Sequence, residues 1–247
     1  SLPAAAKGTA LAVPSRARAA APAGSASTDA YDWLHTNLLF AAVGREMKTV
    51  MITSAIPGEG KTTTALNLAR TMADRGERVL LIDADLRRGR IDAALGTPGA
   101  RGLADLVAGD AGIEEVLQEA GTEGGVLTYL TAGSASEHPT NLLRSVRARL
   151  LVQWAARKFD RVIIDSPPVH AVADAAVLAQ YADGVVVVAR SGVTPYGALA
   201  NAAEQLQRAG AQLMGGVMND VDFDRDARYD ASFRWYGYGR DYYASVN

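Results

Sequence analysis

Short hydrophobic runs alternate with longer amphipathic stretches along most of the chain. The apolar runs lie at 49–53, 79–82, 126–130, 161–164, 184–189 and 213–218. Helical spacing of apolar residues predicts helices at 31–41, 64–70, 141–158, 171–180 and 195–208, with short ones at 102–109 and 113–117. The runs are continuous rather than alternating, which is typical of strands buried on both faces of a parallel sheet. We expect an α/β fold: a doubly wound, mostly parallel sheet with helices on both faces.

A glycine-containing loop at residues 54–63 separates the first of these strands from the helix that follows it. This order of strand, loop and helix is the context of a P-loop, in which backbone amides and the helix N-terminus bind phosphates. The strict pattern has glycine where Ala55 stands, so the loop by itself also fits a glycine-rich helix cap without a ligand. The candidate nucleotide-binding residues of this loop are Pro57, Gly58, Glu59, Gly60, Lys61, Thr62 and Thr63.

Aspartates follow two other apolar runs. Asp83 and Asp85 end the run that begins at Val79, and Asp165 ends the run that begins at Val162. A single carboxylate at a strand end is often a helix cap or a turn residue. Ligands of parallel sheets, however, lie at the carboxyl ends of the strands. Because three aspartates coincide with such ends, we expect them to lie beside the phosphate loop.

Composition narrows the class of protein. A chain of 247 residues with 49% hydrophobic residues suits one large α/β domain. The net charge of −2 gives no reason to expect a nucleic-acid partner. The absence of cysteine fits a reducing compartment, and three scattered histidines show no zinc-type spacing. A helix that spans a bilayer needs about 18 or more consecutive apolar residues, and the sequence has no such run.

Both ends of the chain differ from its centre. Residues 1–28 are rich in alanine and proline and carry cationic but no acidic side chains, as in a flexible linker. We expect the folded domain at 29–225 and a flexible tail at 226–247. Exposed tail tyrosines fit either a partner-binding segment or a set of phosphate acceptors. The five tyrosines of this cluster are Tyr229, Tyr236, Tyr238, Tyr242 and Tyr243.

Taken together, these motifs resemble the bacterial tyrosine kinases of capsule and exopolysaccharide export. The resemblance rests on the loop at 57–62, on Asp83 and Asp85 in the segment 82–88, on 164–168 and on the tyrosine tail. In that family the two aspartate motifs are called Walker A′ and Walker B. The resemblance covers residues 29–247 and implies a P-loop NTPase fold of the MinD/ParA type, similar to ATPases that position division sites and segregate chromosomes.

The resemblance also implies roles for individual residues. Lys61 stabilises the transferring phosphate, and Thr62 and Asp165 hold Mg²⁺ directly or through water. Asp85 supports the metal, and Asp83 faces the acceptor hydroxyl. These assignments suit phosphoryl transfer, in which catalysis is mostly positioning and electrostatic stabilisation.

Other assignments concern the periphery of this site. Asn219, after the last apolar run, stands where similar proteins contact adenine. Arg87 and Arg88 either neutralise phosphates or are ordinary surface arginines.

The implied function is that of an autokinase with ATP and Mg²⁺, which phosphorylates its own tail tyrosines in trans and regulates polysaccharide synthesis or export. In this family the tail of one subunit enters the site of the next within a ring. Five phosphates would add about −7 to −10 charges to the tail, so phosphorylation is expected to dissociate the ring. The family further implies a membrane co-polymerase or activator, fused or separate, and a cytoplasmic location at the inner face of the membrane.

One departure from the family pattern, and one missing hallmark of the alternative function, bear on these expectations. Family members usually carry Glu, Arg and Arg, three residues apart, in the first helix, where they contact the neighbouring subunit. Here Asp29, Asp32 and His35 occupy those positions, so the oligomer is expected to be weaker, differently built or absent. The alternative function, a MinD/ParA-like switch ATPase, has a second lysine at the position of Ile56, and the absence of that lysine argues against it.

Overall fold

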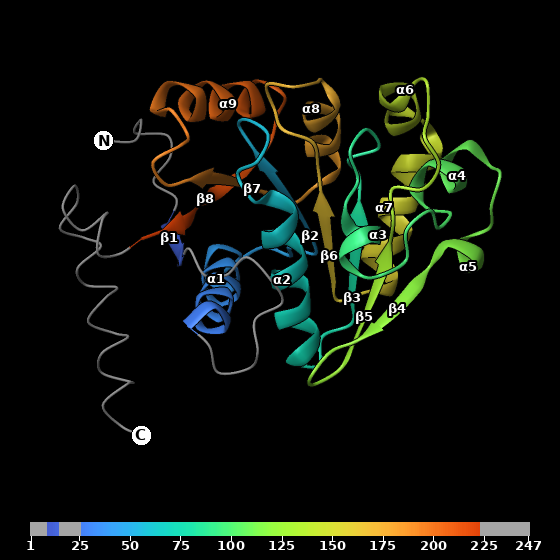
Figure 1. Ribbon diagram of the computed structural model, residues 1–247, viewed down its shortest axis with the longest axis horizontal. Helices are drawn as coiled ribbons and strands as arrows, with labels where there is room; N and C mark the ends of the chain where they lie inside the picture. The colour runs from blue at the N-terminus through green and yellow to red at the C-terminus, as the bar shows by residue number, and fades with distance from the viewer. Residues whose placement is uncertain (1–8, 15–25, 223–247) are drawn as a thin grey trace.

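The computed structural model describes residues 9–14 and 26–222. Within these residues a single eight-stranded sheet has the order β1-β8-β7-β2-β6-β3-β5-β4 (Figure 1). The strands are β1 (Thr9–Pro14), β2 (Thr49–Ser54), β3 (Val79–Asp83), β4 (Gln118–Gly121), β5 (Val126–Leu130), β6 (Arg161–Asp165), β7 (Gly184–Arg190) and β8 (Leu213–Val221).

Helices connect these strands and cover both faces of the sheet (Figure 1). They are α1 (Ala26–Ala41), α2 (Lys61–Asp74), α3 (Ile91–Ala94), α4 (Leu103–Ala108), α5 (Ile113–Val116), α6 (Pro139–Arg144), α7 (Val146–Lys158), α8 (Asp174–Leu178), the 3₁₀ helix η1 (Ala179–Tyr181) and α9 (Tyr196–Arg208). The predicted α/β class and doubly wound arrangement are confirmed.

All strand pairs are parallel except β4 with β5. The chain places β2 near the centre of the sheet, with β6 on one side and β7 on the other. Asp83 of β3 and Asp165 of β6 are direct partners in the register of these two strands. Because the strands are parallel, their carboxyl ends lie at one edge, and both aspartates are therefore at the same edge as the loop after β2.

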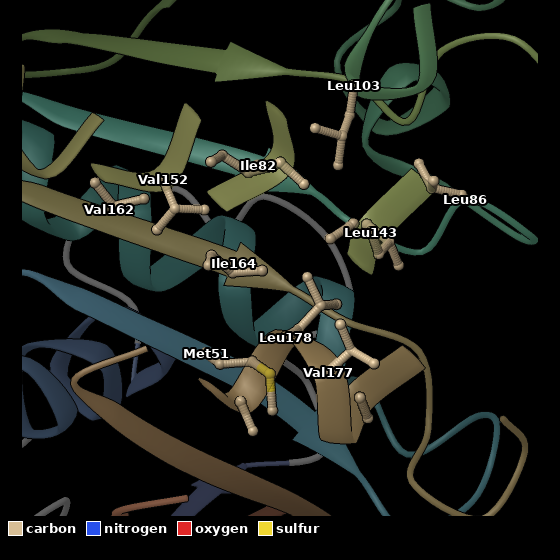
Figure 2. Close-up of a cluster of buried hydrophobic side chains, with 14 of the residues drawn as sticks. Met51, Ile82, Leu86, Leu103, Leu143, Val152, Val162, Ile164, Val177 and Leu178 are labelled. Atoms are coloured by element: carbon tan, nitrogen blue, oxygen red, sulfur yellow. The ribbon is translucent and has the colours of Figure 1, made fainter. Parts of the chain in front are cut away.

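The sheet separates two hydrophobic layers, because successive side chains of a strand point to opposite faces. In β2, Val50 and Ile52 pack with helices α1 and α2, whereas Met51 belongs to the layer on the other face. Figure 2 shows that second layer, where strand residues meet α6, α7 and α8. The residues labelled there are Met51, Ile82, Leu86, Leu103, Leu143, Val152, Val162, Ile164, Val177 and Leu178.

Several elements differ from the sequence-based expectations. The predicted helix at 141–158 is divided at Ser145, whose side chain caps α7 by accepting a hydrogen bond from the Ala148 amide. Strand β4 was not predicted, because only four residues form it and two of them are glycine and alanine. The predicted helix at 171–180 is shorter and ends in the 3₁₀ turn η1.

The ends of the chain also differ from expectation. Two parts of the expected linker 1–28 are regular: Thr9–Pro14 forms β1, which pairs with β8, and α1 begins at Ala26. The tyrosine cluster at 229–243 lies outside the described residues. Among the helices that are described, none is long and apolar enough to cross a membrane.

Candidate functional site

The phosphate loop joins the buried strand β2 to helix α2. Gly58 and Gly60 have φ values of 84° and 93°, a left-handed conformation that side chains with a Cβ rarely adopt. At Gly60 a Cβ would also overlap the amide of Asn219. Both glycines are therefore required by the path of the loop.

The backbone donors in the second half of this loop lack protein acceptors among the described residues. Within residues 9–14 and 26–222, no acceptor is found for the N–H groups of residues 58–63, and the first amide of α2 to find one is that of Thr64, which donates to the Gly60 carbonyl. Such a run of free amides at the N-terminus of a long helix suits phosphate oxygens. The geometry expected for a P-loop is present.

Lys61 extends from the start of α2 toward the two strand-end acids. Its Nζ lies 3.1 Å from Asp85 Oδ2 and 3.5 Å from Asp165 Oδ1, and its side chain is only 12% exposed. Burial lowers the pKa of Lys61, but the carboxylates of Asp165 and Asp85 outweigh this effect and hold the pKa above its usual value. The ammonium is therefore fully charged where a phosphate would bind.

Asp83 is completely buried and is held by main-chain amides. Its Oδ2 accepts hydrogen bonds from Arg90 N at 2.9 Å and Ile91 N at 3.0 Å, and its Oδ1 accepts one from Asp85 N at 3.2 Å. Burial, together with the neighbouring Asp165 carboxylate, raises the pKa of Asp83 to about 7. A carboxyl group with that pKa can take up a proton near neutral pH.

Asp165 has the feature expected of a metal ligand. Its Oδ2 is buried and has no hydrogen-bond partner among the described residues, which is costly for a carboxylate unless a cation or donor is bound. Burial raises the pKa of Asp165 to about 6, although Lys61 acts in the opposite direction. The Thr62 hydroxyl lies beside Lys61 Nζ at 3.3 Å. Oxygen ligands of this kind fit Mg²⁺.

Asn219 and Glu59 connect the phosphate loop to other parts of the sheet. Asn219 Nδ2 donates to the carbonyl oxygen of Glu59 at 3.0 Å, so the last strand reaches the loop. The Glu59 side chain points inward and is fully buried, where it accepts hydrogen bonds from Ile56 N at 2.8 Å and from the Thr194 hydroxyl. Of this residue, only the main chain can contact a nucleotide.

The two arginines after Asp85 have different surroundings. Arg87 Nε lies 2.9 Å from the buried carboxylate of Asp174, and its Nη2 donates to Thr140 Oγ1 at 3.1 Å. Arg88 is exposed, and its backbone amide donates to Asp85 Oδ1 at 3.0 Å. Arg87 therefore links the aspartate loop to α6 and α8, whereas the Arg88 side chain is exposed to solvent.

The unusual residues of the first helix make contacts within the chain. Asp32 Oδ1 lies 2.8 Å from Arg75 Nη2, and the buried His35 places its Nε2 2.8 Å from Glu77 Oε1. Glu77 also pairs with Arg161, at 2.7 Å. Two of the three departures from the family pattern therefore tie α1 to the end of α2 and to the turn that follows it.

Sequence reasoning missed three residues that shape the site. Thr194 contacts Glu59, Asp174 binds Arg87, and Gly89 packs so closely on Ala132 and Asp83 that a Cβ would clash. Thr194 and Asp174 lie 135 and 87 residues from their partners, and a single threonine or aspartate carries no pattern in the sequence. Gly89 alone had a signal, because it follows an aspartate motif directly.

Comparison with known proteins identifies the family of the chain. Residues 47–212 match the family described as an AAA domain. The chain is 40% identical over 205 residues to the tyrosine-protein kinase YwqD of Bacillus subtilis, covering 83% of this chain and 86% of that protein. It is 36% identical over 200 residues to the tyrosine-protein kinase etk of Escherichia coli, covering 81% of this chain but only 27% of that longer protein.

Solved structures show the same relationship. The kinase domain of the E. coli tyrosine kinase ETK superposes with a TM-score of 0.77 at 35% identity, over 80% of this chain and 77% of that one. The cell division ATPase MinD of Pyrococcus furiosus superposes with a TM-score of 0.59 at 25% identity, over 70% and 71% of the two chains. The fold is that of the MinD/ParA type of P-loop NTPase, and the chain belongs to the family of bacterial tyrosine-protein kinases.

Proposed function

We propose that this protein is an autokinase that transfers the γ-phosphate of ATP to the tyrosines of its own C-terminal tail, in trans between subunits. The observation that carries the proposal is the position of the Lys61 ammonium, beside Asp85 and Asp165 and next to a loop with free amides. Membership of the tyrosine-kinase family supplies the acceptor class. The acceptors are Tyr229, Tyr236, Tyr238, Tyr242 and Tyr243.

In this proposal the loop and Lys61 bind the phosphates of the substrate. The amides of residues 58–63 donate to phosphate oxygens, and Lys61 contributes its charge as negative charge builds on the transferring group. Thr62, Asp85 and Asp165 would hold Mg²⁺. The metal, when bound, neutralises phosphate charge. Asn219, which already contacts the loop through Glu59, is the proposed contact for adenine.

Asp83 is the proposed proton acceptor. The tyrosine oxygen forms a bond to the γ-phosphorus, the bond from that phosphorus to the bridging oxygen breaks, and ADP leaves with the electron pair. The phenolic proton passes to Asp83, whose Oδ1 accepts one hydrogen bond from the described residues, that of Asp85 N, and so retains a lone pair. Its pKa of about 7 suits this task at neutral pH.

The proposal extends to the assembly of the protein. Transfer in trans requires contact between copies, and here Asp32 and His35 already have partners within the chain. We therefore propose an oligomer that differs from, or is weaker than, the usual ring and that dissociates when the tail is phosphorylated.

Relatives suggest the biological setting. A putative tyrosine-protein kinase EpsB of Ralstonia solanacearum and one in the cps region of Klebsiella pneumoniae are 36% and 32% identical to this chain. We propose a role at the inner face of the bacterial membrane, with a membrane co-polymerase or activator, in the regulation of polysaccharide synthesis or export.

Mixing variants tests activity and direction of transfer together. In the Lys61→Met variant, which keeps its tail, the tail tyrosines can be phosphorylated only by another copy. The enzyme added to it is a second variant, with Lys61 intact and all five tail tyrosines changed to Phe. The proposal predicts phosphotyrosine on the Lys61→Met tail with ATP and Mg²⁺, and none with Lys61→Met protein alone. Modification of wild-type protein without modification in the mixture would contradict transfer in trans.

A further inference from the structure

An acidic side chain is buried directly beneath the phosphate loop. Glu59 is fully buried, and none of the ion pairs formed by the described residues includes it. A buried carboxylate is costly, and a nucleotide would bring several further negative charges close to it. Its contribution to phosphate binding cannot be a direct attraction, so the contacts of its two oxygens indicate what it does.

Within the described part of the chain, each oxygen of Glu59 has one donor. Oε2 accepts from Ile56 N at 2.8 Å, three residues back in the same loop, and Oε1 accepts from the Thr194 hydroxyl. The Thr194 oxygen itself accepts from Arg190 N at 2.7 Å. A hydroxyl has a single proton, and here the Arg190 amide occupies the oxygen so that this proton is directed at Glu59.

The two donors come from separate segments. Ile56 lies in the phosphate loop, whereas Thr194 lies in the turn between β7 and α9, which is closed by the amides of Val193 and Thr194 donating to the Arg190 carbonyl. The main chain of Glu59 is held from a third side by Asn219. The middle of the phosphate loop is thus anchored to the ends of β7 and β8.

We propose that Glu59 and Thr194 are positioning residues that hold the phosphate loop in its binding conformation before the nucleotide arrives. A loop that is already ordered does not lose conformational freedom on binding, so affinity is higher than for a mobile loop. The inference rests on the proposed function, because it assumes that this loop binds nucleotide phosphates. The new element is that Thr194, in the β7–α9 turn, controls the affinity of the loop for the nucleotide.

The direct test measures ADP affinity by isothermal titration calorimetry with Mg²⁺, for wild-type, Thr194→Val and Thr194→Ser proteins. Valine keeps the size of threonine but leaves Oε1 of Glu59 without a donor, and we expect about tenfold weaker ADP binding. Serine retains the hydroxyl and should bind ADP within about twofold of wild type. The KM for ATP should rise with Thr194→Val, while kcat at saturating ATP stays near the wild-type value.

A control and a second variant separate this role from general destabilisation. Thr36→Val removes a hydroxyl that donates within α1, to the Asp32 carbonyl, and should leave ADP affinity unchanged. Glu59→Gln keeps the shape but cannot accept from both donors, so the proposal predicts weaker ADP binding. Removal of a repelling charge alone would instead strengthen it.

The outcomes are distinct. ADP binding by Thr194→Val equal to wild type, equal losses for the Val and Ser variants, or tighter binding by Glu59→Gln would each overturn the inference while leaving the proposed function intact. If Thr194→Val does not fold, Glu59→Gln decides alone. Wild-type protein that binds neither ADP nor ATP would overturn the proposed function and this inference together.

Discussion

The buried Asp83 carboxyl predicts an unusual pH dependence of stability for the nucleotide-free protein. Its pKa is raised from 3.8 to about 7 in the folded state, first by burial and then by the Asp165 carboxylate. Between these two pH values the folded protein keeps a proton that the unfolded chain has lost. Stability therefore falls as pH rises from about 4 through 7 and becomes constant above that, the reverse of the usual behaviour of a carboxylate.

The magnitude follows from the size of the shift. Between pH 5 and 7, a group that is protonated only in the folded state costs at most about 1.36 kcal/mol for each pH unit, and less near pH 7, where half of the folded molecules have lost the proton; the sum is about 2 kcal/mol. Asp165, with a pKa raised to about 6, acts in the same direction over the lower part of the range. Since the two carboxyls influence each other, their effects do not simply add.

Urea unfolding at pH 5, 6, 7 and 8 measures the pH dependence of the free energy of unfolding directly, with Asp83→Asn as the test variant. Asparagine does not titrate, so the variant should lose about 2 kcal/mol less stability than wild type between pH 5 and 7. Asp160→Asn is the control. A hydrogen bond from Arg78 lowers the pKa of Asp160 to about 2, so the stability that Asp160 adds disappears only below about pH 4, outside the assay. Parallel curves for wild type and Asp83→Asn would refute the reasoning.

Three further changes probe other parts of the account. Asp165→Asn should abolish the increase in ADP affinity on adding Mg²⁺, measured by calorimetry with and without the metal; an unchanged increase would exclude Asp165 as a ligand. Leu80→Ala empties a fully buried core position and should reduce the free energy of unfolding in urea by about 2 to 5 kcal/mol, whereas a loss below 1 kcal/mol would contradict its packing. Asp32→Asn breaks a solvent-exposed pair with Arg75 and should cost less than about 1 kcal/mol in the same assay, so a loss above 2 kcal/mol would show a larger role.

The centre of the site could be predicted from sequence because its residues follow continuous apolar runs. Such runs identify buried parallel strands, and the residues after them must share one edge of the sheet. For this reason the order of residues along the chain is enough to place Lys61, Asp85 and Asp165 together. In the folded protein, Lys61 Nζ lies 3.1 Å from Asp85 Oδ2 and 3.5 Å from Asp165 Oδ1.

Features that depend on tertiary contacts could not be predicted in this way. The inward orientation of Glu59 depends on Thr194, which lies 135 residues further along the chain. The pairing of β1 with β8 is set by a distant edge, and the alanine-rich segment 9–14 carries no strong strand pattern. The break at Ser145 had a local signal, since serine favours the N-cap, but helical spacing on both sides concealed it.

The central claim is that this chain phosphorylates its own tail. Intact-mass spectrometry of phosphatase-treated protein, before and after incubation with ATP and Mg²⁺, tests it most directly, with Asp83→Asn protein in parallel. We expect stepwise addition of phosphoryl groups to wild-type protein, mapped by peptide sequencing to the five tail tyrosines, and a loss of these additions in Asp83→Asn. ATP hydrolysis without any change in mass would contradict it and would indicate a switch ATPase instead.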